Sequence, residues 1–121
     1  MRAELHSLDT ADARHGALDA FVPEDSEHFG LAVTATIGPA DGRGGEQFQF
    51  TVCSPSWLAA EDRPKGFAFQ RTLLLDRWSA ELVERAIADL CRHTEGETWQ
   101  EVAQKLSRYA HWEFEDYREE A

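Results

Sequence analysis

Three stretches in the first half of the chain alternate between apolar and polar residues, with the period of two that is typical of β-strands. They are residues 2–8, 29–37 and 47–53. The stretch between the last two, residues 38–45, is dense in Gly and also contains Pro and Asp, which indicates a loop. Two patterned strands around such a loop predict an antiparallel hairpin. A further strand is predicted over residues 67–75.

Three segments from residue 54 onward are predicted to be helices, and each starts with a residue that can cap a helix. The two longer ones also repeat apolar residues at helical spacing. Ser54 precedes Pro55 at the start of a short helix, where the missing N–H of proline costs nothing. Ser79 starts a longer helix. Thr98 and Glu101 form a capping box, which predicts the start of a second long helix.

Strands followed by helices predict the α+β class, with an antiparallel sheet of about four strands covered on one face by two C-terminal helices. A chain of 121 residues is the usual size of one domain, so residues 1–121 are expected to fold as a single unit. The inward positions of the patterned segments predict the core. It consists of Phe48, Phe50, Val52, Leu82, Ile87, Leu90, Trp99, Leu106 and Trp112.

The formal net charge of −11 changes this picture from that of an ordinary small domain. Residues 1–60 contain 3 basic and 9 acidic side chains, and the remainder contains 9 and 14, so both halves are acidic. This charge disfavours direct binding to nucleic acid or to an anionic membrane, because both need clustered Lys and Arg. It favours rapid, salt-sensitive association with a basic partner, although acidity can also serve solubility alone.

No export signal or membrane span is expected, because the first residues lack an apolar segment and no stretch approaches about 18 apolar residues. The chain is therefore expected to be cytoplasmic. In a reducing compartment Cys53 and Cys91, 38 positions apart, are expected to be buried thiols rather than a disulfide or a zinc site. The five histidines show no metal-ligand spacing, so no metal or other cofactor is expected.

No pattern of catalytic residues is recognisable in the chain. No serine lies in a nucleophile-elbow motif, and the Gly-rich stretch matches no phosphate-binding loop. Glu113, Glu115 and Asp116 lie close together and would suit a small carboxylate-dependent hydrolase, but a solvated acidic surface explains them more simply. The chain is predicted not to be an enzyme.

Four segments carry a resemblance to a known family. They are residues 3–8, residues 37–39, residues 46–58 and residues 98–117, the last with the sequence TWQEVAQKLSRYAHWEFEDY. In this order they resemble the immunity protein 8 family of bacterial polymorphic toxin systems. The resemblance implies an α+β protein, encoded beside a secreted or contact-delivered toxin, that binds and neutralises this toxin in the producing cell.

Two other readings stay open beside the immunity protein: the carboxylate-dependent hydrolase, and an acidic accessory or structural subunit. The toxin partner is expected to be basic, since an acidic inhibitor complements a toxin that attacks nucleic acid. The chain alone leaves the oligomeric state, the toxin's identity and the contact surface open.

The final segment gives the best candidate for that contact surface. If the segment is extended, Glu113, Glu115 and Tyr117 lie on the side opposite Trp112. Tyr is favoured at interfaces and carboxylates complement a basic patch, so partner binding is predicted for Glu113, Glu115, Asp116 and Tyr117. The alternative is that these charges only protect a terminal edge strand from aggregation.

Overall fold

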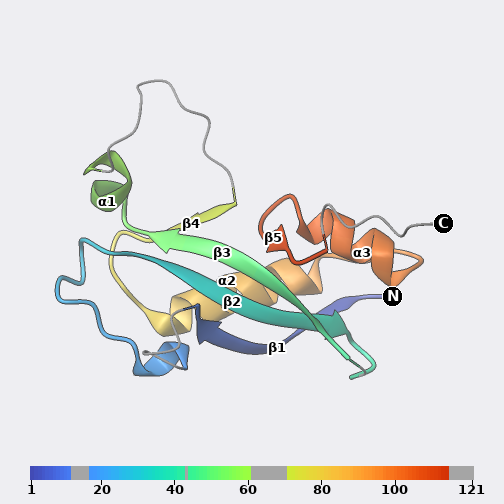
Figure 1. The fold of residues 1–121 in the computed structure, drawn as a ribbon. Helices are drawn as coiled ribbons and strands as arrows, with labels where there is room; N and C mark the ends of the chain where they lie inside the picture. The colour runs from blue at the N-terminus through green and yellow to red at the C-terminus, as the bar shows by residue number, and fades with distance from the viewer. Residues whose placement is uncertain (12–16, 43, 61–70, 115–121) are drawn as a thin grey trace.

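One β-sheet with two helices against one face forms the body of the protein, as the α+β prediction requires (Figure 1). A computed structural model describes residues 1–11, 17–42, 44–60 and 71–114. The strands are β1 (Ala3–Thr10), β2 (Gly30–Pro39), β3 (Glu46–Cys53), β4 (Thr72–Leu74) and β5 (His111–Trp112). They lie in the order β1–β2–β3–β4, and β5 pairs with β3 as well.

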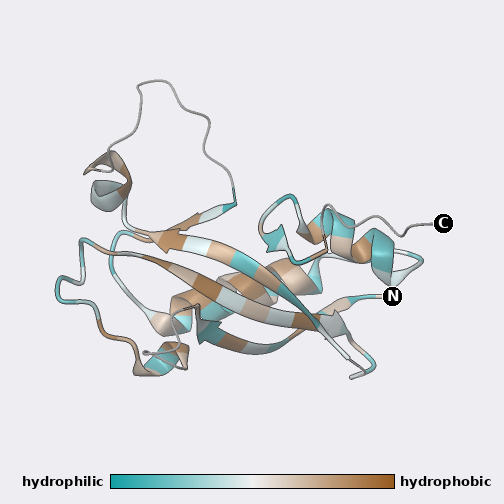
Figure 2. Cartoon of the chain, in the orientation of Figure 1, coloured by the Kyte–Doolittle hydropathy of each residue, from teal (hydrophilic) through white to brown (hydrophobic). Residues whose placement is uncertain are grey.

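The two long helices are α2 (Ala80–Arg92) and α3 (Trp99–Leu106). In Figure 1, α2 runs behind the sheet and α3 lies at the end near β5. Two short helices, η1 (Leu18–Ala20) and α1 (Pro55–Ala60), join neighbouring strands. Hydrophobic segments recur along β2 and α2 in Figure 2, which is the pattern expected for elements that share one core.

The predicted helix caps are present because they depend only on neighbouring residues. Ser79 Oγ accepts from the Leu82 N–H at 3.1 Å, and Thr98 Oγ1 accepts from the Glu101 N–H at 3.1 Å. The second half of the predicted capping box differs. The Glu101 carboxylate accepts from the N–H of Glu97, at 3.3 Å, rather than from that of Thr98.

The hairpin of β2 and β3 is antiparallel, as predicted, and β1 pairs antiparallel with the other side of β2. The β1 register shifts between Leu5 and Ser7, which places His6 in a β-bulge. Before the bulge Ala3 and Leu5 turn toward the core, and after it Leu8 and Thr10 are the more buried residues. The bulge therefore reverses the alternation that the sequence pattern showed only for the first half of the strand.

The fourth strand departs from the fully antiparallel sheet that the sequence predicts. Within the described part of residues 67–75, only Thr72–Leu74 is a strand, and it pairs parallel with β3. Residues 67–70 of that predicted strand lie outside the described ranges. A three-residue strand carries too little pattern to reveal its direction, so tertiary packing determines the pairing.

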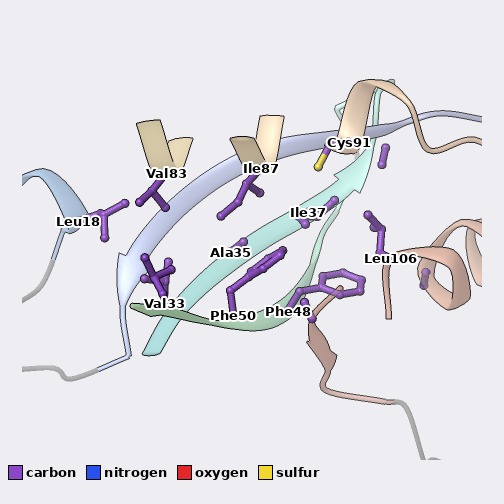
Figure 3. Packing of buried hydrophobic residues seen from close by; sticks show 14 of the residues in the cluster. Leu18, Val33, Ala35, Ile37, Phe48, Phe50, Val83, Ile87, Cys91 and Leu106 are labelled. Carbon is purple, nitrogen blue, oxygen red and sulfur yellow. The ribbon is translucent and has the colours of Figure 1, made fainter. Parts of the chain in front are cut away.

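The core lies between the sheet and the two helices (Figure 3), where Val83, Ile87 and Cys91 of α2 point toward the strands. These three residues are four positions apart and form the buried stripe of α2. Leu82 was predicted to belong to this stripe, but its side chain is 42% exposed because it lies at the flank. The remaining predicted core residues are buried or pack against the core: Phe48, Phe50, Val52, Ile87, Leu90, Trp99, Leu106 and Trp112.

Candidate partner-binding surfaces

The carboxylate of Glu46, at the start of β3, accepts a hydrogen bond on each of its oxygens. The indole N–H of Trp99 donates to Oε1 at 2.8 Å, and the indole N–H of Trp112 donates to Oε2 at 2.5 Å. Trp99 is the first residue of α3 and Trp112 belongs to β5. These three residues, the indole clamp, therefore fasten a helix and a strand to the first residue of β3.

Aromatic packing supports the indole clamp from the core side. The ring of Phe48 stacks on Trp112 with centroids 6.3 Å apart, and it meets Trp99 edge-on at 6.4 Å. Phe114 in turn packs edge-on against Trp112 at 6.0 Å while remaining 41% exposed. The extended conformation considered for this segment ends at Trp112, because residues 113 and 114 form a turn. The clamp is thus an extension of the hydrophobic core to the surface.

Glu113, the first of the predicted partner-binding residues, is bonded to the edge of β3. Its backbone N–H donates to the Gln47 carbonyl at 3.1 Å, and its carboxylate accepts from the Gln47 N–H at 2.8 Å. The side chain is exposed, but one of its oxygens already satisfies a backbone donor. The other three predicted contact residues, Glu115, Asp116 and Tyr117, lie outside the described residues.

A groove of about 680 Å³ lies at the opposite edge of the sheet, between β1 and α2. Two small side chains on α2, Ala80 and Ala88, leave the space open, and Glu84 stands between them one helical turn from each. Leu18 of η1 lines the groove as well. The floor is apolar, with Leu5, Leu8, Leu18 and Cys91 among the lining residues.

Acidic side chains dominate one half of this groove. Asp19, Glu81 and Glu84 place their carboxylates in the half toward η1. Arg2 and Arg92 lie toward the C-terminal end of α2, where Glu4 and His6 of β1 line the groove as well. Glu81 is paired with Arg85 at 2.9 Å, and Arg92 is paired with Asp89. Within the described ranges, the carboxylates of Glu4, Asp19 and Glu84 form no ion pair.

Sequence reasoning did not identify this groove. The signals were an alanine on each side of Glu84 at i−4 and i+4, and the break in alternation at His6. Neither signal indicates a groove before the helix and the strand are known to be neighbours. The C-terminal segment from Trp112 to Tyr117 (the tail) was easier to identify, because its charged and aromatic residues are adjacent in the sequence.

The nearest approach to a catalytic pair is a contact between His28 and Ser56. His28 Nδ1 lies 2.9 Å from Ser56 Oγ, but the Ser56 hydroxyl donates to the Glu27 carbonyl at 3.0 Å. While the Ser56 hydroxyl donates to that carbonyl, its proton is not directed at the His28 nitrogen, as it would be in a serine activated by a histidine base. The geometry fits a loop-fixing hydrogen-bond network and does not fit an activated nucleophile.

Other chemistry finds little support in the described part of the chain. No group of three or more His, Cys, Asp and Glu residues there is placed to hold a metal ion, and none of the described helices is long and apolar enough to cross a membrane. Burial raises the pKa of the Cys91 thiol from 9.0 to about 11. This shift disfavours the thiolate, which is the form that attacks substrates and binds metals.

A comparison with known protein families shows to which family the chain is related. Residues 3–117 match the family described as immunity protein 8. The chain belongs to the immunity protein 8 family. Searches among curated proteins and among solved structures found no match. The four segments that carry the resemblance all lie within the match to immunity protein 8. The match also covers the indole clamp and every lining residue of the groove except Arg2.

Proposed function

We propose that this protein binds a cognate bacterial toxin in the cytoplasm of the cell that makes it and neutralises the toxin by binding alone. The match to the immunity protein 8 family over residues 3–117 carries the proposal. The surroundings of His28, Ser56 and Cys91 support a non-catalytic role, because none of these side chains is activated.

The charge supports a basic partner rather than nucleic acid or a membrane. At a net charge of −11, long-range attraction would bring a cationic toxin to the protein and repel polyanions. The groove offers this partner an acidic surface, with Glu84 exposed at its rim. The tail residues Glu113, Glu115, Asp116 and Tyr117 form one proposed contact surface.

Neutralisation is tested by producing the toxin domain encoded next to this gene, with and without the protein, in a sensitive bacterial strain. Growth is expected to be restored by this protein and not by an unrelated immunity protein produced at the same level. The purified pair is expected to form a stable complex. Continued killing in the presence of folded protein would refute the proposed function.

Steering is tested by measuring association and dissociation rates of the same pair at low and high salt. Since exposed charges are screened beyond about 8–10 Å at physiological ionic strength, the association rate is expected to fall by about tenfold or more. The dissociation rate should change less. An association rate independent of salt would leave solubility as the reason for the acidity.

A further inference from the structure

We propose that the groove between β1 and α2 receives a segment of the toxin in which a Lys or Arg side chain is flanked by apolar residues. The inference rests on the proposed function, and it names the surface and the kind of segment that this function requires. Its starting point is the shape of the groove. A volume of about 680 Å³ admits several side chains at once, which a flat charged face does not.

The outer edge of β1 offers only an irregular set of backbone hydrogen-bonding groups to such a segment. On its outer side, the Ala3 N–H donates to the Thr94 carbonyl at 3.1 Å, and Asp9 forms a bridge to Ala17. Among described residues, no strand pairs with β1 between these two attachments. A free edge invites strand addition, but the bulge at His6 interrupts the regular spacing of its hydrogen-bonding groups. Side chains in the groove therefore provide most of the contact.

The charges of the groove determine where the cation lies. Asp19 and Glu84 line the half toward η1, and neither has an ion pair within the part of the chain that the structure describes. The two arginines of the lining occupy the other end, where Arg92 already pairs with Asp89. A guanidinium or ammonium group in that half would be attracted by the carboxylates of Asp19 and Glu84. The apolar neighbours of that cation would cover Leu5, Leu8 and Leu18.

A second copy of this chain fits the groove less well than a basic toxin does. Each copy carries a net charge of −11, and a two-fold contact through this groove would place like carboxylates near one another. Like charges brought together at an interface oppose association. Charge complementarity thus favours the toxin as the occupant.

Two groove variants test the proposal in different ways. Glu84→Lys reverses the charge at the rim, and Ala88→Phe fills the hollow without changing charge. Glu97→Lys is the matched control, because Glu97 is exposed and does not line the groove. All three are compared with wild type for melting temperature, helical circular dichroism, oligomeric state and affinity for the toxin domain encoded next to this gene.

Both groove variants are expected to keep the wild-type fold and to bind the toxin domain at least about tenfold more weakly. Glu97→Lys is expected to bind within about threefold of wild type. Hydrogen exchange of the wild-type complex should show new protection at residues 4–8 and 80–92.

Several outcomes would overturn the proposal. If both groove variants bind with wild-type affinity, the toxin binds elsewhere and the proposed function remains intact. The same holds for Glu84→Lys alone if Ala88→Phe does not fold. If Glu97→Lys weakens toxin binding as much as Glu84→Lys does, the loss of affinity reflects net charge and not the groove. A wild-type dimer that Ala88→Phe converts to a monomer would make the occupant a second copy. Absence of toxin binding by the wild type would refute the proposed function and this inference together.

Discussion

Glu46 at the start of β3 and Glu84 in the middle of α2 are both carboxylates next to the hydrophobic core, but their surroundings are opposite. Glu46 accepts two indole N–H groups and joins Trp99 and Trp112 to β3. Glu84 lies exposed at the rim of the groove, and the structure shows no ion pair for it among the described residues. Sequence alone gives the two residues the same charge and no reason to treat them differently.

The difference separates carboxylates that stabilise the fold from carboxylates that remain available to a partner. An acceptor that satisfies internal donors is costly to remove, because the donors then lose their partner. An exposed carboxylate without internal donors adds little to stability, so its removal is felt mainly in binding. A substitution at each residue tests whether the residue stabilises the fold or remains available to a partner.

The largest effect is expected from Phe48→Ala, which removes the ring against which both indoles of the clamp pack. Phe48 is fully buried, so the free energy of unfolding should fall by about 3–5 kcal/mol in chemical denaturation. Phe114→Ala is the control, since its ring is 41% exposed and should cost only about 1 kcal/mol. A Phe48→Ala protein with wild-type stability would show that the clamp is not anchored in the core.

Glu46→Ala and Glu84→Ala test the comparison itself. Loss of the Glu46 carboxylate leaves two partly buried indole N–H groups without their acceptor, so unfolding midpoints should report a loss of about 2 kcal/mol. Glu84→Ala should stay within about 0.5 kcal/mol of wild type. Glu46→Gln, which retains one acceptor oxygen, should fall between wild type and Glu46→Ala. Equal costs at positions 46 and 84 would contradict the distinction.

Glu113 lies between the two groups, since it is exposed and yet accepts from the Gln47 N–H. Glu113→Ala is expected to lower stability by about 1 kcal/mol in thermal denaturation because that hydrogen bond is lost. Replacing Glu113 and Glu115 together with alanine tests the predicted contact surface in the tail. Weaker toxin neutralisation beyond that explained by stability would assign these residues to the interface, and full protection would assign them to the edge of the sheet.

The last effect, on the pH dependence of stability, concerns Cys91, which lines the groove and is 1% exposed. Burial raises its pKa from 9.0 to about 11. Above pH 9 the unfolded chain loses this proton while the folded chain keeps it, so stability falls as pH rises toward 11. Urea unfolding at pH 8 and pH 10 should show about 1 kcal/mol more loss for wild type than for Cys91→Ala. An identical loss in both proteins would mean that water solvates the thiol in the folded protein and that burial does not raise its pKa.

The features predictable from the sequence are those that depend on near neighbours. The hairpin of β2 and β3 follows from strict alternation, and the caps at Ser79 and Thr98 follow from residues three positions apart. The α+β class follows in turn from the order of these elements. The same local reasoning placed most of the core correctly and misplaced Leu82 by one position at the edge of a stripe.

The candidate surfaces depend on contacts that no local pattern contains. Trp99 and Trp112 are 53 and 66 positions from Glu46, so the clamp has no signature in the sequence. The parallel direction of β4, the bulge at His6 and the groove beside Ala88 likewise depend on packing between distant segments. The resemblance indicated the family, whereas only the assembled fold shows which carboxylates of the described residues form no ion pair.

The attachment of β1 to the turn between α2 and α3 affects how the protein folds during its synthesis on the ribosome. The Ala3 N–H finds its acceptor at Thr94, and Arg2 forms its bridge with Glu95. The outer side of β1 therefore lacks this hydrogen bond until 84 residues beyond the end of the strand have been synthesised, because β1 ends at Thr10 and the acceptor is Thr94. Contacts so distant in sequence close late in folding. A nascent chain that stalls before Thr94 would leave this edge of β1 open to misassembly.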